Sequence, residues 1–224
     1  MTDVFSFRAL WSRLTGGSDR SRPSPAAAPT LSAADLSPQW LVVGLGNPGD
    51  RYAATRHNVG YMALDDLLAA DGEVLTPLNG FKAEVAQVDW DGESVLLVRS
   101  TTFMNLSGEA VAPLCRKYGI SPDHVVVLHD ELDLPKGKLR VRLGGNENGH
   151  NGLKSTSEQL GTRDYLRVRI GISRPPKGMA VPEYVLGPVG GGAELDAAIA
   201  TAARAARLLV TEGLARAQNQ IHAK

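Results

Sequence analysis

Residues 41–60 read LVVGLGNPGDRYAATRHNVG, and this stretch indicates how the fold begins. Residues 40–43 form a short apolar run beside glycine, which is typical of a buried strand. Turn-forming residues follow at once, beginning with Asn47. Apolar residues at helical spacing begin at Val59, directly after His57 and its neighbour. A strand, a loop and a helix are therefore expected here, and open α/β sheets place their functional groups at such strand ends.

The composition limits the class of protein. The chain has 224 residues, and 24 lysines and arginines balance 24 aspartates and glutamates, so any nucleic-acid-binding surface must be local. The single cysteine, Cys115, excludes an internal disulfide and is expected as an inert thiol in a helix core. No apolar run reaches the length of a membrane span. We therefore expect a soluble, cytoplasmic protein of a reducing compartment.

Residues 1–39 differ in composition from the rest of the chain. Residues 16–38 are rich in Gly, Ser, Pro and Ala, as in flexible linkers, and residues 7–14 have the spacing of a short amphipathic helix. This segment lacks the continuous apolar region of a secretory signal. Its acidic residues argue against an organelle transit peptide. We predict a flexible N-terminal extension over 1–39 and one folded domain over 40–224.

Strand-like and helix-like segments alternate through the folded part. The strand-like segments are 40–45, 81–90, 93–99, 124–128, 137–143 and 166–172, and the helical ones are 58–70, 106–118, 151–160 and 191–218. Asp91-Gly92 between two strand-like runs predicts a hairpin. The expected fold class is α/β: a single domain with a mixed, mostly parallel sheet and helices on both faces.

Polar side chains follow three of the predicted strands where each strand ends. These are Asn47, Asn105 and Asp130. If the strands are parallel, their carboxyl ends share one edge of the sheet, so the three side chains converge beside His57. Asn151 joins them from the start of a later helix.

This set of side chains fits the hydrolysis of an acyl bond by activated water. A neutral His57 can take a proton from water, and Asp130 can accept from the other ring nitrogen and fix the tautomer. Asparagine amides can donate to a developing oxyanion without adding charge. Each residue alone has a simpler explanation, since Asn47 suits a turn and Asn105 and Asn151 suit helix N-caps.

Other kinds of site find less support. Residues 44–49 match G-x-G-x-x-G, but the helix does not begin within these glycines, as a dinucleotide site requires. No G-x-S-x-G segment indicates a serine hydrolase. A metal site of His57, His129, His150 and Asp130 lacks a ligand pair such as H-x-x-x-H. We therefore expect no cofactor and no metal.

Basic residues alternate with apolar ones in two predicted strands. The first run has a basic residue at every second position, namely Lys136, Lys138, Arg140 and Arg142, and the second has Arg167 and Arg169. Because alternate residues of a strand share a face, these charges gather on one side. A solvated sheet face would show the same pattern, but a two-strand basic face beside a polar site favours contact with nucleic-acid phosphates.

Five motifs occur in order over roughly residues 40–190. They are LVVGLGNPG-x2-Y-x2-TRHNVG at 41–60, TTFMNLSG at 101–108, VLHDELDLP-x-G at 127–137, GHNGLKS at 149–155 and RVRIGISRP at 167–175. Together they resemble the motifs of bacterial-type peptidyl-tRNA hydrolases. The resemblance implies a metal-free, usually monomeric α/β enzyme that cleaves the ester between a peptide and the 3′ end of tRNA.

The resemblance also implies roles for individual residues. His57 matches the catalytic histidine and Asp130 its partner. The positions implied to bind substrate are Asn47, Tyr52, Asn105, His150 and Asn151. The positions implied to contact tRNA phosphate are Arg140, Arg142 and Arg169. The implied partner is the acceptor end of peptidyl-tRNA.

The sequence departs from the family pattern in two places. Residues 144–149 read GGNENG, which is bulkier and more acidic than an all-glycine loop. The mobility of this loop, and the entry of substrate past it, can therefore differ from the family pattern. Residues 1–39 lie outside the usual domain. The alternative function is an RNA-binding module on the same fold without hydrolysis, but every catalytic position carries the residue type that an enzyme requires.

Overall fold

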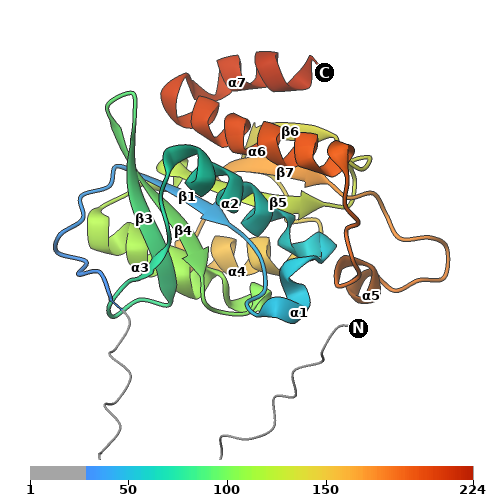
Figure 1. Cartoon of the computed structure of the whole chain (residues 1–224), viewed down its shortest axis with the longest axis horizontal. Coiled ribbons are helices and arrows are strands. Elements are labelled where there is room, and N and C mark those ends of the chain that lie inside the picture. The colour runs from blue at the N-terminus through green and yellow to red at the C-terminus, as the bar shows by residue number, and fades with distance from the viewer. Residues whose placement is uncertain (1–28, 224) are drawn as a thin grey trace, which may run out of the picture.

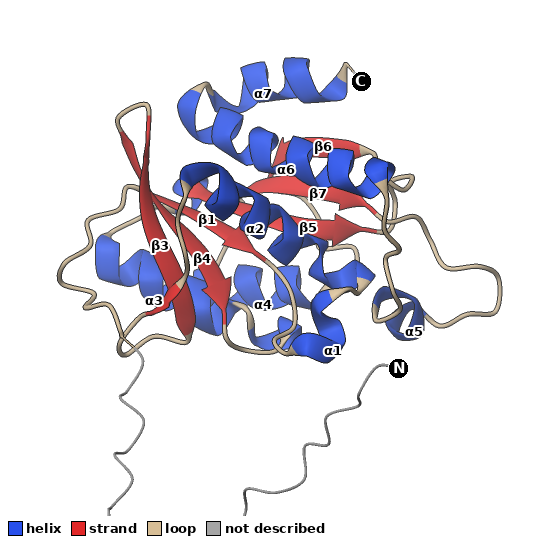
Figure 2. Cartoon of the chain, viewed as in Figure 1, coloured by secondary structure: helices blue, strands red, loops and turns tan. Residues whose placement is uncertain are grey.

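The computed structural model describes residues 29–223, in which one seven-stranded sheet is covered by helices (Figures 1 and 2). The strands are β1 (Trp40–Gly44), β2 (Thr76–Pro77), β3 (Ala83–Trp90), β4 (Glu93–Ser100), β5 (Val125–Glu131), β6 (Leu139–Leu143) and β7 (Leu166–Gly171). The α-helices are α1 (Asp50–Ala53), α2 (Val59–Asp71), α3 (Gly108–Tyr118), α4 (Asn151–Leu160), α5 (Val181–Val185), α6 (Ala193–Thr211) and α7 (Gly213–His222). The 3-10 helices are η1 (Arg56–Asn58), η2 (Met104–Leu106) and η3 (Pro122–His124).

The sheet is mixed and has a parallel centre. Its strand order is β2-β3-β4-β1-β5-β7-β6. Strands β4, β1, β5 and β7 pair in parallel, while β3 and β6 run against their neighbours. The predicted single-domain α/β fold with a mixed, mostly parallel sheet is therefore confirmed.

Helices cover both faces of this sheet, as predicted. Because successive side chains of a strand face opposite sides, Val42 of β1 packs in the core beneath α2, α6 and α7. Its neighbours Leu41 and Val43 pack in the core beneath α3 and α4. Figure 2 shows α2 and α6 on the near face of the sheet. The two faces form separate apolar cores, and β1 and β5 are buried between them.

The strand order changes direction at β1, which locates the expected site. From β1 the chain continues through α2 to β3 and β4, which lie on one side of β1 in the sheet. It then continues through α3 to β5, which lies on the other side of β1. Crossover connections between parallel strands are right-handed. The crossover from β1 to β4 and the crossover from β4 to β5 run in opposite directions across the sheet, so their helices, α2 and α3, lie on opposite faces. A crevice opens outside the carboxyl ends of the strands at such a point.

The long helix predicted over 191–218 is divided in the structure. Helix α6 ends at Thr211, and α7 begins at Gly213, whose φ of 79° is in the left-handed region. The break allows α7 to turn back along the edge strand β6 (Figure 1). There the N–H of Val141 donates to His222 Nε2 at 3.0 Å, and Gln218 Nε2 donates to the Val141 carbonyl at 3.2 Å. Helix α7 thus satisfies backbone groups of an edge strand.

The hairpin prediction is confirmed by its backbone. Asp91 and Gly92 both have positive φ, 56° and 90°, which matches the turn that joins two twisted antiparallel strands. The predicted core position of Cys115 is also confirmed, since the thiol is buried and burial raises its pKa to about 11. Within residues 29–223, no helix combines the length and apolar character needed to cross a bilayer.

Residues 29–39 lie against the domain, although they belong to the segment predicted as an extension. The N–H of Leu31 donates to the Pro77 carbonyl at 2.9 Å, and the Tyr118 hydroxyl donates to the Ala33 carbonyl at 3.2 Å. Leu36 joins the same core. Residues 1–28, including the helix predicted at 7–14, lie outside the described residues, so the flexible extension stays a prediction.

Candidate active site

A cavity of about 630 Å³ lies at the carboxyl ends of β1 and β5. Its polar wall comes from the loop after β1, from η2, from the end of β5 and from the loop before α4. Its apolar wall comes from Leu132 and from α5 with the residue after it. The cavity walls include Asn47, His57, Asn105, Asp130, His150 and Asn151. The convergence predicted from the strand ends is therefore observed.

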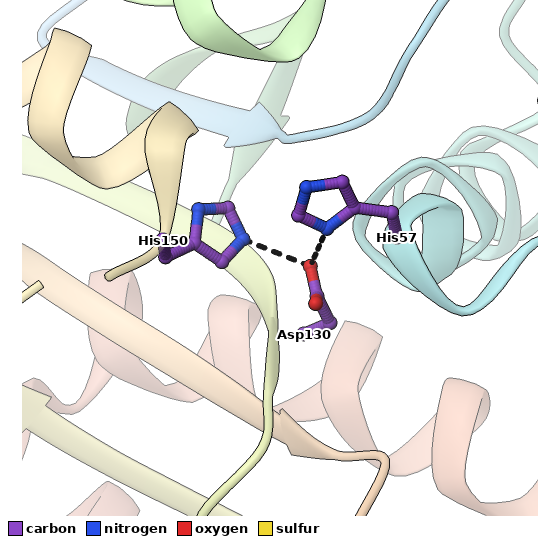
Figure 3. A group of neighbouring side chains, drawn as sticks. All are labelled: His57, Asp130 and His150. Carbon is purple, nitrogen blue, oxygen red and sulfur yellow. Dashed lines mark hydrogen bonds and ion pairs between the residues drawn. The ribbon is translucent and has the colours of Figure 1, made fainter. Parts of the chain in front are cut away.

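His57 and Asp130 are in direct contact in this cavity (Figure 3). His57 lies in η1, just before α2, and its Nδ1 is 2.8 Å from Oδ1 of Asp130 on β5. Both residues are buried, with exposed fractions of 9% and 3%. Burial alone would raise the pKa of Asp130, but the imidazoles of His150 and His57 lower it well below its usual range. The carboxylate is therefore ionised, and it accepts hydrogen bonds but cannot donate them.

His150 is the second donor to Asp130. Its Nε2 is 2.8 Å from the same carboxylate oxygen. Figure 3 shows both rings directed at this oxygen. Its Nδ1 accepts the backbone N–H groups of Gly152 and Leu153 at 3.1 and 3.3 Å, and so caps α4. A ring nitrogen that accepts two N–H groups carries no hydrogen, so the hydrogen of His150 is on Nε2. His150 is thus a neutral donor whose two nitrogens both have partners within the protein.

The same reasoning fixes the tautomer of His57. Because Asp130 only accepts, His57 Nδ1 carries the hydrogen, and in the neutral ring the lone pair is therefore on Nε2. Figure 3 shows this second nitrogen on the side of the ring away from Asp130. The arrangement orients a base for proton transfer.

His57, Asp130 and His150 are also close enough to share a metal ion, since their ligand atoms lie within 4.8 Å of one another. However, the two nitrogens that face the carboxylate both carry hydrogens in this hydrogen-bond pattern. A protonated nitrogen has no lone pair for a metal. The donor set therefore fits a hydrogen-bonded triad better than a metal site.

Asn47 is held rigidly at the cavity wall. Its backbone N–H donates to Asn58 Oδ1, and its carbonyl accepts from Asn58 Nδ2, both at 2.9 Å. Its side-chain Oδ1 accepts the N–H of Met104 at 2.9 Å. With the oxygen engaged, the amide presents Nδ2 as a donor.

The remaining predicted substrate residues fall into two groups. Asn105 and Asn151 line the cavity and are exposed, and neither caps a helix, because the N-caps of η2 and α4 are Phe103 and His150. The simpler helix-cap explanation is therefore wrong for both. Tyr52 lies on α1, where its ring meets that of Phe103 edge-on at 6.3 Å.

Four arginines share one face of the β6–β7 pair, as the alternation predicted. Arg140 is opposite Arg169, and Arg142 is opposite Arg167. We call this set, Arg140, Arg142, Arg167 and Arg169, the arginine face. Arg167 is only 1% exposed, and its Nη1 donates to the Asn146 carbonyl at 2.8 Å. Arg169 Nε donates to Glu131 Oε2 at 3.0 Å.

The bulkier loop at 144–149 is tied to its surroundings. Glu147 is buried, and its Oε1 accepts from Arg163 Nε at 2.6 Å. Burial would raise the pKa of Glu147, but the hydrogen bond from Arg163 contributes to a net lowering. Arg142 lies against Gly145, where a side chain would collide with the guanidinium. Sequence reasoning found neither this ion pair nor the hydrogen bonds of His150, because both depend on the path of the loop.

Comparison with known proteins identifies the family. The family model for peptidyl-tRNA hydrolase matches residues 41–224. Peptidyl-tRNA hydrolase 2 of Corynebacterium glutamicum is 58% identical over 200 residues, covering 89% of this chain and 93% of the relative. Peptidyl-tRNA hydrolase of Cutibacterium acnes is 44% identical, covering 84% of this chain and 100% of the relative.

Solved structures agree with the sequence comparison. The crystal structure of peptidyl-tRNA hydrolase from Acinetobacter baumannii has a TM-score of 0.77 and 37% sequence identity, and the match covers 84% of this chain and 96% of that one. The chain belongs to the peptidyl-tRNA hydrolase family.

Proposed function

We propose that this protein hydrolyses the ester bond between peptide and tRNA in peptidyl-tRNA, using water activated by His57 and Asp130. Such a reaction recycles tRNA during translation. The observation that carries the proposal is the short His57–Asp130 hydrogen bond in the cavity, which leaves His57 Nε2 as a base. Family membership supplies the substrate class.

The reaction follows from the tautomers. His57 Nε2 removes a proton from water, and the water oxygen attacks the ester carbonyl carbon to form a tetrahedral oxyanion. Asp130 stabilises the imidazolium that results, without taking the proton itself. When the intermediate collapses, His57 returns the proton to the ribose oxygen that leaves. The products are the free peptide acid and tRNA with its terminal hydroxyl restored.

The asparagines would hold the peptide part. Asn47 Nδ2 is fixed as a donor, because its oxygen is bonded to the Met104 N–H. A preoriented amide of this kind stabilises an oxyanion without reorganisation. Asn105 and Asn151 present exposed amides at the cavity wall, which suits hydrogen bonds to the peptide backbone.

The two ends of the substrate would leave the cavity in different directions. The apolar wall at Leu132, Val181 and Val185 suits peptide side chains. The tRNA phosphates would contact the arginine face through Arg140, Arg142 and Arg169. Tyr52 and His150 were also expected to bind substrate. The structure favours a positioning role for His150, and we keep Tyr52 as a contact of the tRNA 3′ end.

We also propose that the protein acts as a monomer in the cytoplasm, without a metal. One chain supplies the base, its carboxylate partner and the amide donors. Light scattering of the purified protein at working concentration should give the mass of one chain. Activity should be unaffected by a chelator, and a loss that added metal restores would contradict the metal-free mechanism.

The decisive experiment is hydrolysis of a model peptidyl-tRNA by the wild type and by His57→Ala. We expect His57→Ala to lower kcat by roughly 10³-fold, the range for losing a general base. Binding of uncharged tRNA should be unchanged. His124→Ala is the matched control, because His124 lies on η3 against Trp40 and outside the cavity walls. A wild type that binds tRNA but releases no peptide would favour the RNA-binding module instead.

A further inference from the structure

His129, beside the catalytic carboxylate, is fully buried and has no part in the mechanism above. Only 1% of its surface is exposed. Its Nδ1 is 2.7 Å from the backbone carbonyl oxygen of Asp130. A carbonyl accepts but never donates, so Nδ1 carries the hydrogen. The side chain of His129 therefore holds the backbone of the residue whose carboxylate orients His57.

The ring of His129 also supports the second donor to that carboxylate. It packs edge-on against the ring of His150, with the centroids 5.2 Å apart and the planes at 79°. His150 in turn donates to Asp130 Oδ1 at 2.8 Å. The His129 ring thus contacts both the Asp130 backbone and His150, and each of these helps to position the Asp130 carboxylate.

The second nitrogen of His129 adds an independent observation. Nε2 is one of three buried side-chain atoms within residues 29–223 that have no hydrogen-bond partner. Burial, and then the neighbouring His150, lower the pKa of His129 well below its usual value. The charged groups around it are Asp130 and Arg167. The imidazole is therefore neutral, with a buried lone pair on Nε2.

A buried acceptor without a partner is unfavourable, and an apolar side chain would avoid it. The property that an apolar side chain cannot supply here is the N–H of Nδ1. We propose that His129 is a positioning residue for the hydrolysis proposed above, acting through the hydrogen bond that its Nδ1–H donates to the Asp130 backbone carbonyl. The inference rests on that proposed function.

Two amide substitutions distinguish the role of His129 Nδ1 from that of Nε2. His129→Asn places an N–H near the position of Nδ1, whereas His129→Gln places its amide near the position of Nε2. Both remove the ring, so they form a matched pair. His129→Phe keeps a flat ring but has no N–H.

We expect His129→Gln and His129→Phe to lower kcat by roughly 10–100-fold, since small displacements of catalytic groups have effects of this size. His129→Asn should remain within about 5-fold of the wild type. The KM and the affinity for uncharged tRNA should change little in all three. Thermal unfolding of each variant shows whether a loss reflects the fold instead.

An Asn variant as impaired as the Gln variant, or a Phe variant as active as the wild type, would overturn the proposal. A wild type without hydrolysis under the same conditions would instead contradict the proposed function. The tautomer can also be tested without substitution. Long-range ¹H–¹⁵N NMR of the wild type at about pH 7 should show His129 protonated on Nδ1 alone, because a carbonyl accepts from Nδ1 and burial lowers the pKa of the ring. Protonation on Nε2 would overturn the proposal even if no variant folds.

Discussion

The cavity and the arginine face lie on the same sheet, yet they hold their polar groups differently. In the cavity, His57 and His150 both donate to one oxygen of Asp130, so one negative charge is shared by two neutral rings. On the arginine face, four positive side chains lie opposite one another in two pairs. In the cavity, uncharged donors stabilise a single negative charge by hydrogen bonds, whereas the arginine face concentrates positive charge.

The two regions also differ in what the hydrogen bonds accomplish. In the cavity they fix tautomers, and so determine which atom can accept a proton. On the arginine face they distinguish Arg167, which is buried against loop carbonyls, from Arg169, which is paired with Glu131 and remains half-buried. Arg140 and Arg142 are also half-buried, so Arg167 alone of the four is withdrawn from solvent. Position on a shared face therefore does not establish a shared role.

The largest expected effect comes from breaking the shared carboxylate. Asp130→Asn should lower kcat by roughly 10²–10⁴-fold, because an amide can donate to His57 and favours the wrong tautomer. Affinity for uncharged tRNA should change little, since no phosphate contact is removed. Single-turnover hydrolysis and tRNA binding should be measured together. Equal losses of affinity and rate would show that Asp130 acts in binding.

The second-largest expected effect concerns Arg167, which lies opposite Arg142 on the arginine face. Arg167→Met should lower the free energy of unfolding by about 2–3 kcal/mol, because the Asn146 and Arg163 carbonyls lose a charged donor. Chemical denaturation measures this change. The dependence of tRNA affinity on salt should stay as in the wild type. A shallower slope with unchanged stability would mean that Arg167 contacts phosphate.

Its partner across the strands should behave in the opposite way. Arg142→Gln should leave the free energy of unfolding within about 0.5 kcal/mol of the wild type. It should weaken tRNA binding several-fold and reduce the slope of log affinity against log salt by about 1. Binding titrations at several salt concentrations test this. An unchanged slope would remove Arg142 from the phosphate contacts.

The smallest effect concerns His222, whose Nε2 accepts the backbone N–H of Val141 in strand β6. Burial, and then the charge of Arg140, lower its pKa below the usual value near 6.5. A lowered pKa means that protonation favours the unfolded chain, so this contribution to stability is lost as the pH falls below about 6.5. His222→Gln keeps an acceptor for the Val141 N–H and should remove that loss.

The measurement for His222 is the free energy of unfolding at about pH 7.5 and pH 5. The difference between the two values should be smaller in His222→Gln than in the wild type by no more than about 0.5 kcal/mol, because the ring is partly exposed. His124→Gln provides a control on a second, half-buried histidine. An unaltered difference in the His222 variant would show that the ring does not titrate against folding.

Much of the fold could be predicted because the central strands are buried on both faces. Their apolar runs are continuous, and turn residues such as Asp91-Gly92 separate them. Helices α1 and α5 were not predicted, because four or five residues are too few to show a helical period. The break at Gly213 was missed because helix-forming residues continue on both sides of it.

The site was predictable to a similar depth. Strand ends located Asn47, Asn105 and Asp130, because the end of a strand is visible in the sequence. The second donor to Asp130 was not predicted, since His150 reaches it only through the path of the loop before α4. Alternation placed Arg142 and Arg167 on one face but could not distinguish them, since the loop carbonyls that bind Arg167 come from elsewhere in the chain.

The position of α7 has a consequence for how the protein is handled. With α7 in place, the backbone N–H and carbonyl of Val141 are bonded to His222 and Gln218. A chain truncated before Gly213 would leave these groups open as a template on which a strand of another molecule could add. We expect such a truncated protein to aggregate at concentrations where the intact protein stays in solution.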